Sequence, residues 1–385
     1  MKGSSSFLIG LGLGVVAVAA GYLALRNMPA PEPTAEEIRD RLVFNLDNAP
    51  VKLPRALPEA VLTRSCAFGP TLVEAQRSTV KPVAKPGGEA PVDDGATYDH
   101  PTPESRLHAI LDATTCRELG ALEGVNTEDL SDIARSSPLL VRRAWNNGDA
   151  VSARAWAVRT WALGQDLMAA DPNRTELGSE LVAAGADGLA FWLVQQDVPE
   201  DVRKEGTVLA MALLSTSPPA SILVEQRATR MLRRGLSSPV ALNLDAKGLT
   251  AAFEAAGAWW GGVSEAMDTP GAPVPGPAER PPDSTRDTVD VLAAMTDHGL
   301  EDWFTSVRAA DRGRLAVTLL LNLDRTTCAT PWQGDPPKDP VTGEPAGWDV
   351  DSCTLTLGDQ QWGRQVAVPE EDFGRTDGKR FGPPD

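Results

Sequence analysis

The stretch AVSARAWAVRTWALGQDLMAA, Ala150 to Ala170, carries the strongest helical signal in the chain. Asp149 precedes it as an N-cap, and Asp171-Pro172 ends it. Its apolar residues fall on two faces, one with Val151, Ala155, Val158 and Ala162, the other with Trp156, Leu163 and Leu167. Two apolar faces require neighbours on two sides, so we expect this helix to be central in a helical array.

Helical patterns of about 15–20 residues, separated by short Pro or Gly breaks, surround this stretch. Thr34 and Glu37 form a capping box at the start of one of them. The run Leu249 to Met267 has the cleanest period of all. The fold class predicted is mainly α: an N-terminal transmembrane helix, then an α-solenoid or irregular helical bundle, with a small disulfide-linked, β-containing C-terminal cap.

Composition shifts along the chain predict its divisions. In order they are a short tail at 1–6, a membrane anchor at 7–25, a Pro-rich tether at 26–34, a helical body at 35–268 with a long loop at 78–103, a Pro-rich linker at 269–283, a helical segment at 284–327, and a Gly/Pro-rich cap and tail at 328–385. In the cap, Thr354–Leu357 alternates like a strand, with Gln365–Val368 as its candidate partner.

The run Phe7 to Leu25, FLIGLGLGVVAVAAGYLAL, has 19 residues and no charge. As a helix it spans roughly 28 Å, close to the hydrocarbon thickness of a bilayer. The alternative is a cleaved signal at Ala17-Val18-Ala19, but the apolar run continues beyond that site. We therefore expect an uncleaved single-pass anchor, although its flanking charges do not decide its orientation.

The four cysteines are Cys66, Cys116, Cys328 and Cys353. An even number, widely spaced and downstream of an export segment, predicts two disulfides, and we favour Cys66–Cys116 and Cys328–Cys353 because each pair lies within one region. The alternative is that the four cysteines are buried free thiols, which we would expect only if the body lay in the reducing cytoplasm. The cysteines thus favour an inner (cytoplasmic) membrane protein whose body lies in the periplasm or outside the cell.

The chain is acidic, with 385 residues, a net charge of −17 and a pI near 4.7. Nucleic acid requires a basic face, so it is not expected as a partner. Against this background Arg227, Arg230, Arg233 and Arg234 gather at one helix end. We expect either a solvated face that balances the helix dipole or a docking patch for an acidic partner, and we take Arg227, Arg230 and Arg234 as candidate contacts.

The adjacent Trp259 and Trp260 cannot both face one core, so one of them reaches a neighbouring element or an exposed partner site. Both are candidate partner contacts.

No motif of a nucleophile, phosphate-binding loop or zinc protease occurs, so no catalytic or cofactor residue is predicted. Glu104 and His108, with His100 nearby, are read as a helical surface pair rather than a metal site. The acidic residues of the cap provide oxygen ligands suited to Ca²⁺, but their spacing is not that of an EF-hand, and no metal site is assigned to Asp335, Asp339, Asp349 and Asp351.

The turn Asp339-Pro-Val-Thr-Gly-Glu-Pro345, after a leucine-rich helix and before a short strand, resembles the C-terminal element of some uncharacterised bacterial envelope proteins. The resemblance implies no activity. The expected function is a protein-binding or scaffold component of a bacterial envelope complex, with other envelope proteins as partners. The alternative is an extracytoplasmic enzyme with a cleft between the helical body and the C-terminal cap.

Overall fold

The structure is a computed structural model that describes residues 33–47, 53–57, 62, 64–78, 110, 112–296 and 299–364. The predicted anchor Phe7 to Leu25, most of the tether, the loop beyond residue 78 and the tail beyond residue 364 lie outside these ranges. The transmembrane part of the predicted fold class therefore has no structural support.

The described residues are mainly helical, with 63% of the residues in helices and two small sheets, which confirms the mainly helical part of the predicted class. Among them, one stretch, Pro172–Val194, is long and apolar enough to cross a membrane. Since 83% of its apolar window is buried inside the fold, it has the environment of a core helix.

The chain folds into two compact units, neither of which is continuous in sequence. Unit 1 takes its described residues from within Met1–Val51, Pro219–Asp268 and Pro273–Leu300. Unit 2 takes its own from within Lys52–Pro218, Thr269–Ala272 and Glu301–Asp385.

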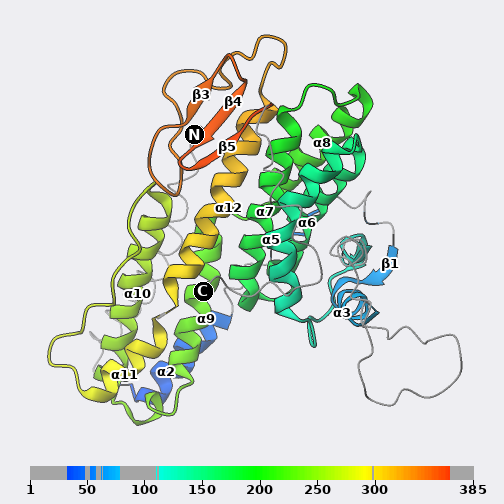
Figure 1. Ribbon diagram of the computed structural model, residues 1–385. Helices are drawn as coiled ribbons and strands as arrows, with labels where there is room; N and C mark the ends of the chain where they lie inside the picture. Colours follow the sequence, from blue (N-terminus) through cyan, green and yellow to red (C-terminus); the bar gives the residue numbers. More distant parts are fainter. Residues whose placement is uncertain are drawn as a thin grey trace, which may run out of the picture. The chain divides into compact units, whose positions relative to one another are not determined.

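The centre of unit 2 is a layer of three helices, α5 (Thr127–Asn146), α6 (Ala150–Ala170) and α7 (Thr175–Val194), which pack against one another (Figure 1). Helix α8 (Glu200–Thr216) packs on α6. Trp156 and Trp161 on α6 are both buried, as are Val158, Ala162, Leu163 and Leu167, whereas Val151 at the start of the helix is exposed. The prediction of a central helix at Ala150 to Ala170 is confirmed.

Glycines let α6 and α7 approach each other closely. A Cβ on Gly185 of α7 would lie 2.7 Å from Cα of Trp161 and 2.8 Å from the carbonyl oxygen of Ala157, both on α6. A Cβ on Gly164 of α6 would lie 2.9 Å from the amide nitrogen of Val182. These separations are too short for a side chain, so the crossing depends on glycine at both positions.

A small N-terminal part of unit 2 lies around the first disulfide. Strand β1 (Arg64–Ala67) pairs in parallel with β2 (Cys116–Glu118), and α3 (Phe68–Ser78) follows β1. Cys66 and Cys116 are bonded with their Cα atoms 4.9 Å apart, which confirms the predicted pair. This bond joins two segments that are 50 residues apart in sequence.

The C-terminal cap of unit 2 follows α12 (Leu300–Leu321). It is an antiparallel sheet in the order β3 (Gly347–Asp349), β4 (Thr354–Leu357) and β5 (Gln360–Trp362). The bond Cys328–Cys353 confirms the second predicted pair. The strand at Thr354–Leu357 is also confirmed; its partners are β3 and β5, and Gln365–Val368 lies outside the described residues.

Unit 1 is helical in its described part, with α2 (Ala35–Asp47), α9 (Ala220–Leu236), α10 (Ala246–Asp268) and α11 (Arg286–Met295) packed together (Figure 1). The capping box of α2 is formed: Thr34 receives a hydrogen bond from the Glu37 amide, and Glu37 receives one from the Thr34 amide. The predicted face of α10 is buried at Leu249, Ala256, Trp260, Val263 and Met267.

Candidate functional site

Two of the five predicted partner contacts are inside unit 1. Trp260 is 2% exposed, and its indole nitrogen donates to the carbonyl oxygen of Met295 at 3.0 Å. Arg227 is 8% exposed, with Nη2 donating to the carbonyl oxygen of Gly299 at 3.3 Å. Both side chains are therefore buried in the packing of α9, α10 and α11. Arg227 does not lie on the positive surface where it was expected, and Trp259, not Trp260, is the accessible member of the tryptophan pair.

The other three candidates remain accessible. Trp259 is half-buried, meets Trp260 edge to face with ring centroids 4.8 Å apart, and donates to the carbonyl oxygen of Gly276. Arg230 is half-buried and Arg234 is exposed, one turn apart on α9. Their role as partner contacts stays a prediction.

The acidic residues of the cap do not converge on a common point. Asp339 is fully buried and faces Arg312 of α12, which donates Nε to Oδ1 at 2.9 Å and Nη2 to Oδ2 at 2.7 Å. Asp349 instead accepts hydrogen bonds from Ser352 and from the Asp351 amide. No group of three or more metal-ligating side chains occurs in the described part of the chain. Glu104, His100 and His108 lie outside that part.

Burial raises the pKa of Asp339, but the hydrogen bonds from Arg312, Thr342 and the Val341 amide lower it more, so its pKa lies below the usual value. Asp339 is therefore a structural anion that ties the cap to α12. Nη1 of Arg312 also donates to Asp359 at 2.7 Å, and Asp359 is 85% exposed.

Two more carboxylates serve the same kind of purpose in unit 2; Asp166 is buried and Asp187 is half-buried. Asp166 on α6 receives Nε and Nη2 of Arg55, each at 2.8 Å, which attaches residues 53–57 to the core. Asp187 on α7 receives the indole nitrogen of Trp362 from β5 at 2.8 Å and lies 3.4 Å from Arg142. Burial raises the pKa of Asp187, and Arg142 and Trp362 oppose that rise.

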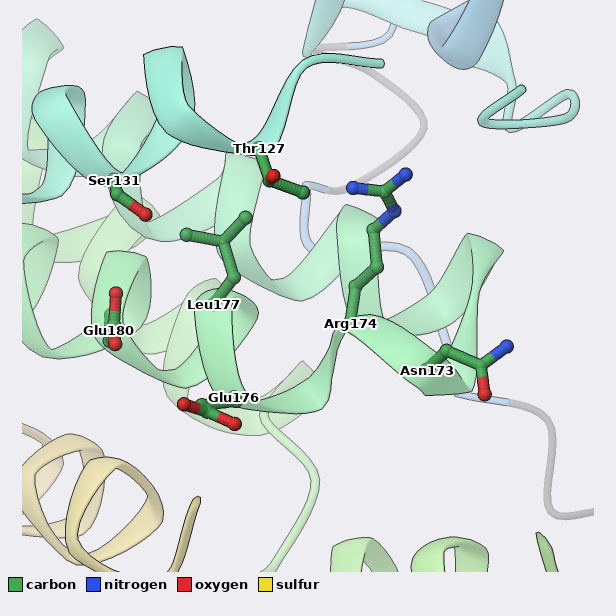
Figure 2. A pocket seen from close by; sticks show the side chains of 7 residues that line it. All are labelled: Thr127, Ser131, Asn173, Arg174, Glu176, Leu177 and Glu180. Carbon is green, nitrogen blue, oxygen red and sulfur yellow. The ribbon is translucent and has the colours of Figure 1, made fainter. Parts of the chain in front are cut away.

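A pocket of about 220 Å³ opens in unit 2 where α5 and α7 begin. Figure 2 shows Leu177 in its middle, with Arg174 on one side and Glu180 on the other. The lining side chains are polar apart from Leu177: Thr127, Ser131, Asn173, Arg174, Glu176 and Glu180.

The two sides of the pocket differ in charge. Burial raises the pKa of Glu180, and the neighbouring carboxylates Glu176 and Asp302 raise it further against the effect of Arg135. On the other side, Nε of Arg174 lies 3.6 Å from Asp171, while Nε and Nη1 are buried without a hydrogen bond. The arrangement holds charge of both signs, which suits the pocket to binding polar groups.

The sequence analysis did not predict the structural roles of the carboxylates Asp339, Asp166 and Asp187. A signal was present for one of them, because Asp166 is a lone acid within the apolar run of α6. A buried charge at such a position requires an oppositely charged or hydrogen-bonding partner, but the periodic pattern alone does not indicate which residue that is.

Comparison with protein-family models, with curated proteins and with solved structures found no match to this chain.

Proposed function

We propose that this chain is a single-pass inner-membrane protein whose body lies outside the cytoplasm, where it serves as a protein-binding or scaffold component of a bacterial envelope complex. The proposal joins three observations: an apolar N-terminal run, two disulfides and a helical body with no assembled catalytic group among its described residues.

The observation that carries the proposal is the pair of disulfides, Cys66–Cys116 and Cys328–Cys353. Such bonds form and persist in oxidising compartments and are rare in a reducing cytoplasm. They support a body outside the cytoplasm, and the uncharged run Phe7 to Leu25 supplies a membrane attachment of suitable length.

For partner binding, the accessible candidates are Arg230 and Arg234 on α9, with Trp259 on α10 of the same unit. Aromatic and arginine side chains are enriched where protein interfaces gain most of their affinity. Because the chain carries a net charge of −17, a positive patch on it favours partners with an acidic surface.

Copurification of the full-length chain from native detergent tests this function. We expect a partner recovered at fixed stoichiometry with the wild type and lost or weakened with Arg234→Glu. Arg286→Glu is the matched control, because Arg286 lies in the same unit and is 92% exposed. No partner with the wild type, together with a monomeric and inert body, would contradict the proposal, as would equal loss with both variants.

The second candidate, an enzyme with a cleft between the helical body and the cap, gains nothing from the contacts in that region. Asp339 is engaged by Arg312, and Trp362 by Asp187. An unbiased activity screen of the full-length chain separates the two functions.

A further inference from the structure

Three arginines of unit 2 come together where α7 ends. Arg203 on α8 donates Nη2 to the carbonyl oxygen of Gln196 at 2.7 Å and to that of Gln195 at 3.1 Å. Arg325, four residues after α12, donates Nε to the carbonyl oxygen of Leu193 at 2.7 Å. Two segments that are far apart in sequence thus bring guanidinium groups to the end of α7, and a third segment adds Arg364.

Arg364, two residues after β5, donates Nη2 to the carbonyl oxygen of Arg325 at 2.6 Å. With its amide oriented for this contact, Gln196 accepts from Nη1 and Nη2 of Arg364 through its side-chain oxygen. Gln196 therefore touches both Arg203 and Arg364, and we call Arg203, Arg325 and Arg364 the arginine triad.

The arginine triad has no paired carboxylate in the described part of the chain. Other arginines of unit 2 do: Arg55 has an oxygen of Asp166 at 2.8 Å, and Arg312 has one of Asp339 at 2.7 Å. Around the arginine triad, the carboxylate whose charge acts on Arg203 is the exposed Asp197, which forms no ion pair with it.

Burial and mutual repulsion make the charged forms of the arginine triad less favourable. All three side chains are half-buried. Burial, together with the charges of Arg203 and Arg364, lowers the pKa of Arg325 to about 10. Nε of Arg364 is buried without a hydrogen-bond partner. The fold therefore holds three like charges close together with part of their hydrogen-bonding capacity unused.

Helix capping accounts for only a part of this charge. The C-terminal end of a helix carries roughly half a negative charge, and one cation is enough to complement it. Three guanidinium groups, set against that half charge and the single charge of Asp197, leave a surplus of about 1.5 positive charges. A phosphate group carries about −1.5 to −2 at neutral pH and accepts hydrogen bonds on several oxygens.

We propose that the arginine triad is a binding site for a phosphate group, either the free ion or a phosphoryl group on a larger molecule. Nη1 and Nη2 of Arg325, with Nε and Nη1 of Arg203, are not used in the contacts above and are the donors that the ligand would meet. Guanidinium groups bind phosphate oxygens in paired, charge-assisted hydrogen bonds, which suits such a site. A bound anion would also relieve the mutual repulsion of the three cations.

Thermal unfolding of the full-length chain in sodium phosphate against sodium chloride, at matched pH and ionic strength, tests this site. We expect the wild type to show a saturable rise in Tm with phosphate that chloride does not produce. Arg325→Gln should weaken phosphate binding at least tenfold. Arg286→Gln, at a 92% exposed arginine outside the arginine triad, should bind phosphate as the wild type does.

Should Arg325→Gln fail to fold, Arg203→Lys keeps the charge and removes the planar fork, and it should weaken phosphate binding several-fold. An equal rise in Tm with both salts, or equal phosphate binding by the wild type and both arginine-triad variants, would overturn the proposal. Titration with phenyl phosphate separates the two sources: tighter binding than inorganic phosphate indicates a phosphorylated molecule, and equal or weaker binding indicates the free ion.

Discussion

The attachment of the cap to α12 rests on one arginine with two unequal carboxylates. Arg312 lies 2.7 Å from an oxygen of Asp339, which is 0% exposed, and 2.7 Å from one of Asp359, which is 85% exposed. The two ion-pair distances are equal, but Asp339 is buried and Asp359 is exposed to solvent. The pair of substitutions Asp339→Asn and Asp359→Asn therefore isolates the effect of burial on an ion pair.

We expect Asp339→Asn to destabilise the protein by about 3 kcal/mol, the low end of the range for removing one partner of a buried ion pair. The low end applies because Asp359 still contacts Arg312 and because an asparagine oxygen still accepts from the Val341 amide. Asp359→Asn should cost less than about 1 kcal/mol, as is usual for an exposed partner.

Urea unfolding followed by tryptophan fluorescence provides the measurement, since Trp348 and Trp362 both lie in the cap strands. The folded-state pKa of Asp339 is lowered, so its ionised form adds stability above the unfolded-state pKa of about 3.9, and this contribution is lost as the pH falls through the folded-state value. The difference in unfolding free energy between the wild type and Asp339→Asn should therefore become smaller as the pH is lowered. Equal losses of unfolding free energy in the two variants would show that burial does not strengthen the pair of Arg312 with Asp339.

Three further predictions concern the disulfides, the helix crossing and the pocket. Replacing Cys328 and Cys353 by alanine should lower the unfolding free energy by about 3.5 kcal/mol on the loop-entropy estimate for 25 residues, and reductant should then have no further effect on that loop. Gly185→Ala should cost about 3 kcal/mol because its Cβ has no room against α6, whereas Gly262→Ala, with no atom within 4 Å, should stabilise by about 0.5–1 kcal/mol; thermal unfolding showing the same sign for both would contradict this. Because burial and neighbouring carboxylates raise the pKa of Glu180, its ionisation opposes folding, so Glu180→Gln should gain stability relative to the wild type as the pH rises from 4 to 7, by less than about 1 kcal/mol, and a flat pH dependence would speak against that reading.

Local patterns predicted the local structure well. The capping box at Thr34, the two-faced helix Ala150–Ala170 and the strand Thr354–Leu357 all depend on residues that are near one another in sequence. The disulfide pairing was also predicted, because both bonds join cysteines within one region of the chain.

The long-range features were not predictable in this way. At the close crossing of α6 and α7, Gly185 lies against the backbone of Trp161. The residues that neighbour each of them in sequence do not indicate this contact. The same holds for the arginine triad, whose members come from α8, the end of α12 and the end of β5.

The candidate contacts show why a one-dimensional pattern misplaces single side chains. Trp259 and Trp260 were expected to face different surroundings, and they do: one is half-buried and the other is in the core. Arg227 was read as part of a positive surface with Arg234. The two are seven residues apart on one side of α9, but Arg227 is buried and donates to the carbonyl oxygen of Gly299, whereas Arg234, near the C-terminal end of the helix, is exposed.

The proposed function depends on a body that lies outside the cytoplasm, and a topology experiment in intact cells tests that location. A reporter fused to the C-terminus, read together with thiol labelling under non-reducing conditions, gives location and cysteine state at once. We expect a C-terminus outside the cytoplasm and no labelling of Cys66, Cys116, Cys328 or Cys353 until a reductant is added. A cytoplasmic C-terminus with four thiols that label without reductant would contradict it.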